Sequence, residues 1–173
     1  MESPHDSVLI ALLEEGRQDV LVSVRDLSDE QAATKPALDR WSVLECLEHI
    51  VAVEDRFLGW LTTGEVQQTP QRDTEKEGRL FGMITDRSTK VQAPEAVVPT
   101  GRFTSLAAAV DAFNEARNRT AQIARARGTE LYAVKVAHAR FGEMNGSELM
   151  HLLTGHARRH ASQILETRAE IEK

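Results

Sequence analysis

Cysteine and long hydrophobic runs are scarce in this sequence, and each shortage narrows the class of protein. Cys46 is the one cysteine among 173 residues, which excludes an internal disulfide and favours a reducing compartment. No apolar stretch approaches the roughly 20 residues that a membrane-spanning helix needs. The first residues, MESPHD, are polar and acidic, unlike a signal peptide. We therefore expect a cytoplasmic protein that does not associate with membranes.

Positive charge is also in short supply. Acidic side chains outnumber basic ones 27 to 21, which gives a net charge of −6 with neutral histidines. Proteins that bind nucleic acids normally carry the opposite excess, so this class is disfavoured. Hydrophobic residues make up 41% and charged residues 28%, as in ordinary globular proteins. The length fits a single domain over residues 1–173 with a core that needs no disulfide.

Aromatic residues, at 5%, and prolines, at five, are few, and their distribution favours helices. Long stretches contain no proline, which would break a hydrogen bond in a helix interior. No segment shows sustained alternation of apolar and polar residues, so the sequence predicts an all-α fold. Capping signals and apolar spacing place four main helices. They are expected from Ser3, from Ser42 to Gly59 or Gly64, over 105–127, and from Asn145 to the C-terminus.

The remaining segments connect these helices. Residues 28–36 predict a short helical turn. Residues 132–142 are ambiguous: an extended run over 131–134 is the alternative, and we interpret the segment as a linker. Between the second and third main helices we expect a loop, a short helix and an irregular crossover, over 64–74, 76–87 and 91–102. The predicted architecture is therefore a four-helix bundle with a long crossover between its second and third main helices.

Two of the six histidines have the spacing of a metal-binding pair. His156 and His160 are four residues apart in the last predicted helix, so their rings stack on one face. Two neutral imidazoles at this separation can chelate one divalent ion. The pair continues the apolar stripe formed by Leu152 and Ile164, and burying imidazoles is costly unless their lone pairs are bound. The alternative, a pair that packs in the core without metal, stays open.

His49 is the third candidate ligand. It lies between Leu47 and Ile50 on the inward edge of the second helix. In a bundle, a ligand on one helix can meet a pair on another helix across the core. Three protein ligands with an open position are typical of a catalytic metal site. A single histidine on an apolar face is more often a core residue, so the two interpretations of His49 compete.

Other polar residues near these histidines are weaker candidates. Glu45, one turn before His49, can act as a base or only as the cap of its helix. Gln163, one turn after His160, can orient that ring or a bound cofactor. Arg159 can hold a carboxylate or can simply be solvated. The roles of Cys46, His138 and His151 are not decided, although a buried small hydrophobe is the commoner role of a lone cysteine.

Two segments resemble signatures of the DinB-like (DinB/YfiT) family of metal-binding four-helix bundles. Residues 41–50, WSVLECLEHI, are similar to the Trp-Ser…His signature that opens the second helix of this family. Residues 155–164, GHARRHASQI, are similar to the last-helix signature His-x-x-Arg-His-x-x-Gln. The similarity extends over nearly the whole chain in the same order.

The resemblance implies a divalent metal, commonly zinc or nickel, bound by His49, His156 and His160. Some relatives are thiol-dependent transferases or isomerases that use bacillithiol or mycothiol. The leading hypothesis is therefore a metal-dependent S-transferase or hydrolase that acts on a small-molecule substrate through a metal-activated thiol or water. The alternative is a non-catalytic, stress-related metal-binding homodimer, for which Trp60 and Leu61 would form an exposed patch.

Overall fold

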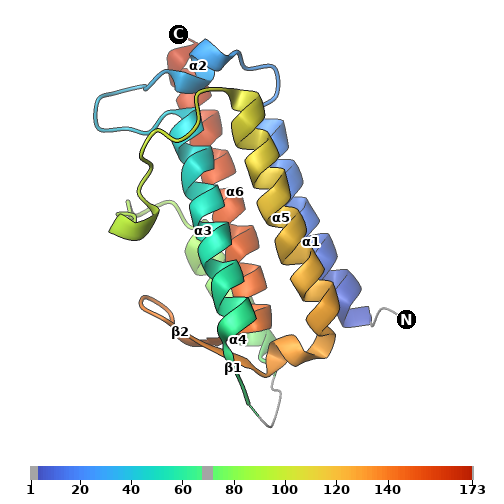
Figure 1. The fold of residues 1–173 in the computed structure, drawn as a ribbon. Coiled ribbons are helices and arrows are strands. Elements are labelled where there is room, and N and C mark those ends of the chain that lie inside the picture. Colours follow the sequence, from blue (N-terminus) through green and yellow to red (C-terminus); the bar gives the residue numbers. More distant parts are fainter. Residues whose placement is uncertain (1–3, 68–71, 173) are drawn as a thin grey trace.

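Four long helices form the body of the protein in the computed structural model, which describes residues 4–67 and 72–172. α1 and α3 each pack against both α5 and α6. α3 and α5 run in one direction and α1 and α6 in the other (Figure 1). The long helices are α1 (Pro4–Ser23), α3 (Val43–Thr63), α5 (Leu106–Arg127) and α6 (Gly146–Ile171).

Local capping interactions explain why two of these helices begin where the sequence predicts. At α3, Ser42 accepts a hydrogen bond from the backbone N–H of Glu45, and the Glu45 carboxylate accepts one from the N–H of Ser42. Asn145 and Glu148 form the same reciprocal pair at α6. Each box satisfies N–H groups that have no partner inside the helix. The predicted cap of the first helix, Ser3, lies outside the described residues.

The connection between α3 and α5 holds several short elements. One of them, α4 (Thr74–Thr85), lies close to the short helix that the sequence predicts over residues 76–87. It packs against α6. The part predicted as a loop includes a two-residue strand that joins a sheet. The elements of this connection are, in chain order, β1 (Glu65–Val66), α4 (Thr74–Thr85) and the 3-10 helix η1 (Glu95–Val97). A further short helix, α2 (Asp29–Ala33), precedes α3.

The prediction of a linker over residues 132–142 is wrong. This segment follows the 3-10 helix η2 (Gly128–Tyr132) and forms most of a β-hairpin, to which β1 adds a third antiparallel strand. Val134 and Val136 are buried, whereas Lys135 between them is exposed. This period-two pattern is too short to stand out in the sequence. The strands are β2 (Val134–His138) and β3 (Gly142–Asn145).

The apolar core consists of two clusters stacked along the bundle. One cluster includes Phe57 and Leu153 and lies toward the sheet. The other includes Leu47 and Ile164 and lies toward α2. On α3 and α6 the change from one cluster to the other falls close to His49 and His156. Within the described residues, no helix is long and apolar enough to cross a membrane.

Gly155 allows α4 and α6 to approach closely. A Cβ atom at this position would lie 2.2 Å from Cγ2 of Ile84 and 3.4 Å from Cδ2 of Phe81. Ile84 is buried and β-branched, so its side chain has little freedom to move away. The glycine that precedes His156 is therefore required for the packing of these two helices.

We expect Gly155→Ala to destabilise the protein, although alanine is favoured over glycine by about 1 kcal/mol in a helix interior. The clash with Ile84 should outweigh this gain and lower the free energy of unfolding by about 1–3 kcal/mol in urea denaturation. Gly59→Ala and Gly82→Ala are matched controls, because a Cβ at either helical position meets nothing within 4 Å. Stabilisation at all three positions would show that α4 is not held tightly against α6.

Candidate metal centre

Three imidazole rings from two helices meet inside the bundle. His49 on α3 and His156 and His160 on α6 each place a ring nitrogen so that all three atoms lie within 4.8 Å of one another. Nε2 of His49 is 3.0 Å from Nε2 of His156. The ring centroids are separated by 4.5–4.9 Å. The structure thus brings together the three residues that the sequence selects as candidate ligands.

Hydrogen bonds on the far side of two rings determine which nitrogen faces the centre. Nδ1 of His49 donates to the carbonyl of Val97 at 2.7 Å, and Nδ1 of His160 donates to Oε1 of Gln163 at 2.9 Å. A neutral imidazole that carries its proton on Nδ1 presents the lone pair of Nε2. Both rings are therefore held in the tautomer in which Nε2 carries the lone pair that can bind an ion, and Nε2 of His49 faces Nε2 of His156.

Burial keeps these histidines uncharged. The side chains of His49 and His160 belong to residues that are only 4% and 6% exposed. Burial lowers the pKa of His49, and it lowers the pKa of His160 well below the usual range, with His49 as the next cause. Burial, followed by the neighbouring imidazoles, also lowers the pKa of His156 strongly. Neutral imidazole is the form that binds metal, so the cluster is ready to do so at neutral pH.

Trp41 forms an aromatic wall beside the cluster. Its ring centroid lies 4.9 Å from that of His49 and 6.2 Å from that of His160. In the sequence, Trp41 is the first residue of the segment that resembles the Trp-Ser…His signature, but that resemblance does not give the position of its ring. Because Trp41 precedes α3, helical periodicity gives no information about the direction of its side chain. The indole covers one side of the histidine cluster with apolar surface.

Glu48 connects the site to the crossover. Its carboxylate accepts hydrogen bonds from the N–H groups of Thr100, Gly101 and Arg102 and from the hydroxyl of Thr100, at 2.7–3.0 Å. Burial alone would raise the pKa of Glu48, but these hydrogen bonds outweigh it and hold the pKa below its usual value. Sequence reasoning missed this residue because its partners lie more than fifty positions away in an irregular segment.

Glu45 and Arg159 are engaged in structural interactions. Besides capping α3, the carboxylate of Glu45 pairs with Lys35 at 2.7 Å. The guanidinium of Arg159 donates to the backbone carbonyls of Ile84, Asp86 and Thr89, at the end of α4 and just beyond it. Both side chains therefore have partners that account for their positions without a ligand.

The remaining candidates lie outside the cluster. His138 on β2 packs against aromatic rings, including that of Trp60, and His151 on α6 contacts the carbonyl of Ser147 through Nδ1. Cys46 is fully buried, and burial raises the pKa of its thiol to about 12. The cysteine therefore behaves as a core residue. The predicted exposed patch at Trp60 and Leu61 is wrong, because Leu61 is completely buried.

A buried ion pair lies close to the histidines. Nε of Arg117 on α5 is 3.2 Å from Oε1 of Glu54 on α3, and both side chains are almost inaccessible. The charge of Arg117 is near enough to contribute to the low pKa of His156. Burial raises the pKa of Glu54, which the neighbouring Arg117 opposes. The pair and the histidines form a polar layer between the two apolar clusters, and the sequence pattern did not indicate the pair.

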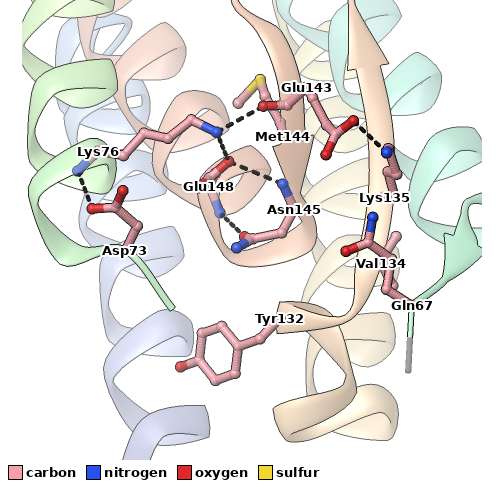
Figure 2. Close-up of a pocket in the computed structure, with 10 residues that line it drawn as sticks. All are labelled: Gln67, Asp73, Lys76, Tyr132, Val134, Lys135, Glu143, Met144, Asn145 and Glu148. Atoms are coloured by element: carbon pink, nitrogen blue, oxygen red, sulfur yellow. Dashed lines mark hydrogen bonds and ion pairs between the residues drawn. The ribbon is translucent and has the colours of Figure 1, made fainter. Parts of the chain in front are cut away.

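A separate pocket of about 200 Å³ lies at the sheet end of the bundle. Figure 2 shows that its charged side chains face one another. Lys76 contacts the carboxylate of Glu148 at 2.8 Å and the carbonyl of Glu143 at 2.7 Å, and Lys135 pairs with the Glu143 carboxylate. None of the three histidines lines this pocket. Because its charges are already paired, the histidine cluster is the better candidate for a functional site.

We expect the metal-free protein to lose stability as the pH falls below about 6.5. Histidines of the unfolded chain take up protons near that pH, whereas the lowered pKa values of His156 and His160 keep them neutral in the folded state. The free energy of unfolding should therefore be constant above this pH on their account and fall by about 1.4 kcal/mol per pH unit for each histidine below it. Urea denaturation at several pH values, with a chelator present, measures this slope.

The variant His156→Gln/His160→Gln is the control for this experiment. Glutamine does not titrate, so the variant should lose most of the pH dependence between the ordinary and the lowered pKa values. An unchanged slope would mean that other groups cause the acid sensitivity.

Comparison with known proteins places the chain in a family. The model of the DinB superfamily matches residues 12–164, which include all three histidines. The chain is also 26% identical to the uncharacterized protein YuaE of Bacillus subtilis (strain 168), over 95% of this chain and 99% of that protein. The match to the family model covers far more than half of the sequence and agrees with the helical fold. The chain therefore belongs to the DinB superfamily.

Proposed function

We propose that the protein binds one divalent ion, zinc or nickel, through His49, His156 and His160. The observation that supports this proposal is the convergence of three neutral imidazoles within 4.8 Å, with two of them fixed in the Nε2-binding tautomer. Nitrogens bound to one tetrahedral zinc lie about 3.3 Å apart, given zinc–nitrogen distances of about 2.0–2.1 Å. The separation of 3.0 Å between Nε2 of His49 and Nε2 of His156 is close to this spacing.

Three protein ligands leave room for a further ligand, and we infer that this ligand is a low-molecular-weight thiol. A divalent ion held by these residues would lower the pKa of a thiol or water bound to it. The chain's contribution is to orient the rings through Val97 and Gln163 and to limit water through Trp41. In the proposed S-transfer, the thiol would release its proton to solvent, its sulfur would form a bond to an electrophilic carbon, and the bond from that carbon to the leaving group would break, with the electron pair departing on the leaving group.

The sulfur has to come from outside the chain. Cys46 is the one cysteine of the sequence, and its burial and its pKa of about 12 keep it protonated. Hydrolysis by an activated water is the variant of the proposal in which no thiol takes part. A metal that only stabilises the bundle is the competing, non-catalytic function.

The untagged protein should bind one equivalent of Zn²⁺ or Ni²⁺ per chain, measured by elemental analysis and calorimetry. In the variant His156→Ala/His160→Ala the affinity should fall by more than the roughly 10- to 100-fold that is typical of losing an outer hydrogen-bond partner. His151→Ala is the matched control, since His151 lies on the same helix but outside the cluster. Equal metal binding by the double variant would contradict the proposed ligands.

Thiol binding is tested on the Co²⁺-loaded protein. A low-molecular-weight thiol should produce a sulfur-to-cobalt charge-transfer band, and the band should persist in Cys46→Ala, because the buried thiol does not supply the sulfur. Product analysis with a model alkylating electrophile then tests transfer. A protein that binds metal but shows neither the band nor a product with thiol or water would support the non-catalytic function.

A further inference from the structure

We propose that Glu48 is a positioning residue that orients His49 by holding the crossover segment whose carbonyl binds the His49 ring. The hydrogen bonds of Glu48 go to residues 100–102 of the crossover, so its action on the histidine cluster is indirect. The importance of Glu48 for function rests on the proposed metal site, but its effect on the geometry of His49 can be tested in the metal-free protein.

Two adjacent residues of α3 bind the same short segment of the crossover. His49 donates through Nδ1 to the carbonyl of Val97, and Glu48 accepts from the backbone of Thr100, Gly101 and Arg102. The two attachment points are three residues apart along the crossover. A displacement of the second point therefore displaces the carbonyl that fixes the tautomer of His49.

The backbone of the crossover forms a specific binding site for the Glu48 carboxylate. Glu48 is 8% exposed, and three backbone N–H groups and one hydroxyl converge on its two oxygens. Gly101 has a φ of +86°, a left-handed conformation that allows consecutive N–H groups to point toward one anion. A glycine at this place is thus matched to the carboxylate of Glu48.

This part of the crossover contains little regular structure. Between α4 and α5 the regular structure is limited to η1, which comprises three residues and ends at Val97. Val97 buries its side chain, and the N–H of Val98, in the same peptide group as the Val97 carbonyl, donates to the carbonyl of Glu95 at 3.2 Å. The carbonyl is therefore fixed within η1, and the hydrogen bonds to Glu48 help to fix η1 relative to α3.

The variant Glu48→Gln tests the inference because it keeps the size of the side chain and replaces one accepting oxygen by a donating NH₂ group. Amide hydrogen exchange at Thr100, Gly101 and Arg102 should become faster. In nitrogen NMR spectra of the metal-free protein, His49 should change from one Nδ1–H tautomer to a mixture. His160, which Gln163 holds, should remain unchanged and serves as the internal control. Co²⁺ affinity, followed by the absorption of the ion, should fall about 10-fold.

Glu148→Gln is the matched control variant. Glu148 is similarly buried, at 3%, and also accepts a backbone N–H group, but it lies at the other end of the bundle, in the cap of α6. This change should lower the melting temperature and leave the His49 tautomer and the Co²⁺ affinity within about twofold of the unmodified protein, because its hydrogen bonds do not reach the histidines. Gly101→Ala disturbs the same segment from the other side, so it provides a second test if Glu48→Gln does not fold.

Faster amide exchange in the crossover with an unchanged His49 tautomer and unchanged Co²⁺ affinity would overturn the inference, because Glu48 would then hold the crossover only. The tautomer measurement separates this result from a failure of the proposed function. If the unmodified protein binds no metal but Glu48→Gln still frees the His49 ring, the positioning role stands and the metal proposal falls.

Discussion

The site depends on one constraint: three imidazole rings must be buried side by side without carrying charge. Burial makes a positive charge on one of these rings costly, and the neighbouring imidazoles add to that cost, so the pKa of His156 lies well below its usual value. Neutral rings in turn need acceptors for their N–H groups, and the carbonyl of Val97 and the side chain of Gln163 serve two of them. The first of these acceptors ties the crossover to α3, and the second lies on α6 itself, one turn beyond His160.

The same constraint explains the division of the core. Apolar side chains fill the bundle on both sides of the histidines, in one cluster toward the sheet and another toward α2. The buried pair of Glu54 and Arg117 lies between α3 and α5, close to the histidines between α3 and α6. The opposite charges of this pair offset each other, whereas either charge alone in the core would be uncompensated. The layer therefore localises the polarity of the interior.

The sequence predicts those parts of the fold and site that depend on neighbours along the chain. His156 and His160 share a helix face by spacing alone, and the capping box at Ser42 acts over three residues. Val97 and Glu48 escaped prediction because their partners lie 48 to 54 positions away in a segment without periodicity. The hairpin was missed because its strands have five and four residues, too few for a clear alternation.

The contact between Arg159 and the end of α4 bears on how the chain assembles during synthesis. The carbonyls that this guanidinium binds belong to residues 70 to 75 positions earlier in the chain. A cation at the C-terminal end of a helix stabilises that end, and here the cation arrives from another helix. While the polypeptide emerges from the ribosome, the C-terminal end of α4 therefore lacks this cation until Arg159 has been added, 70 to 75 residues later. Completion of this end of α4 is thereby tied to α6, the helix that carries His156 and His160.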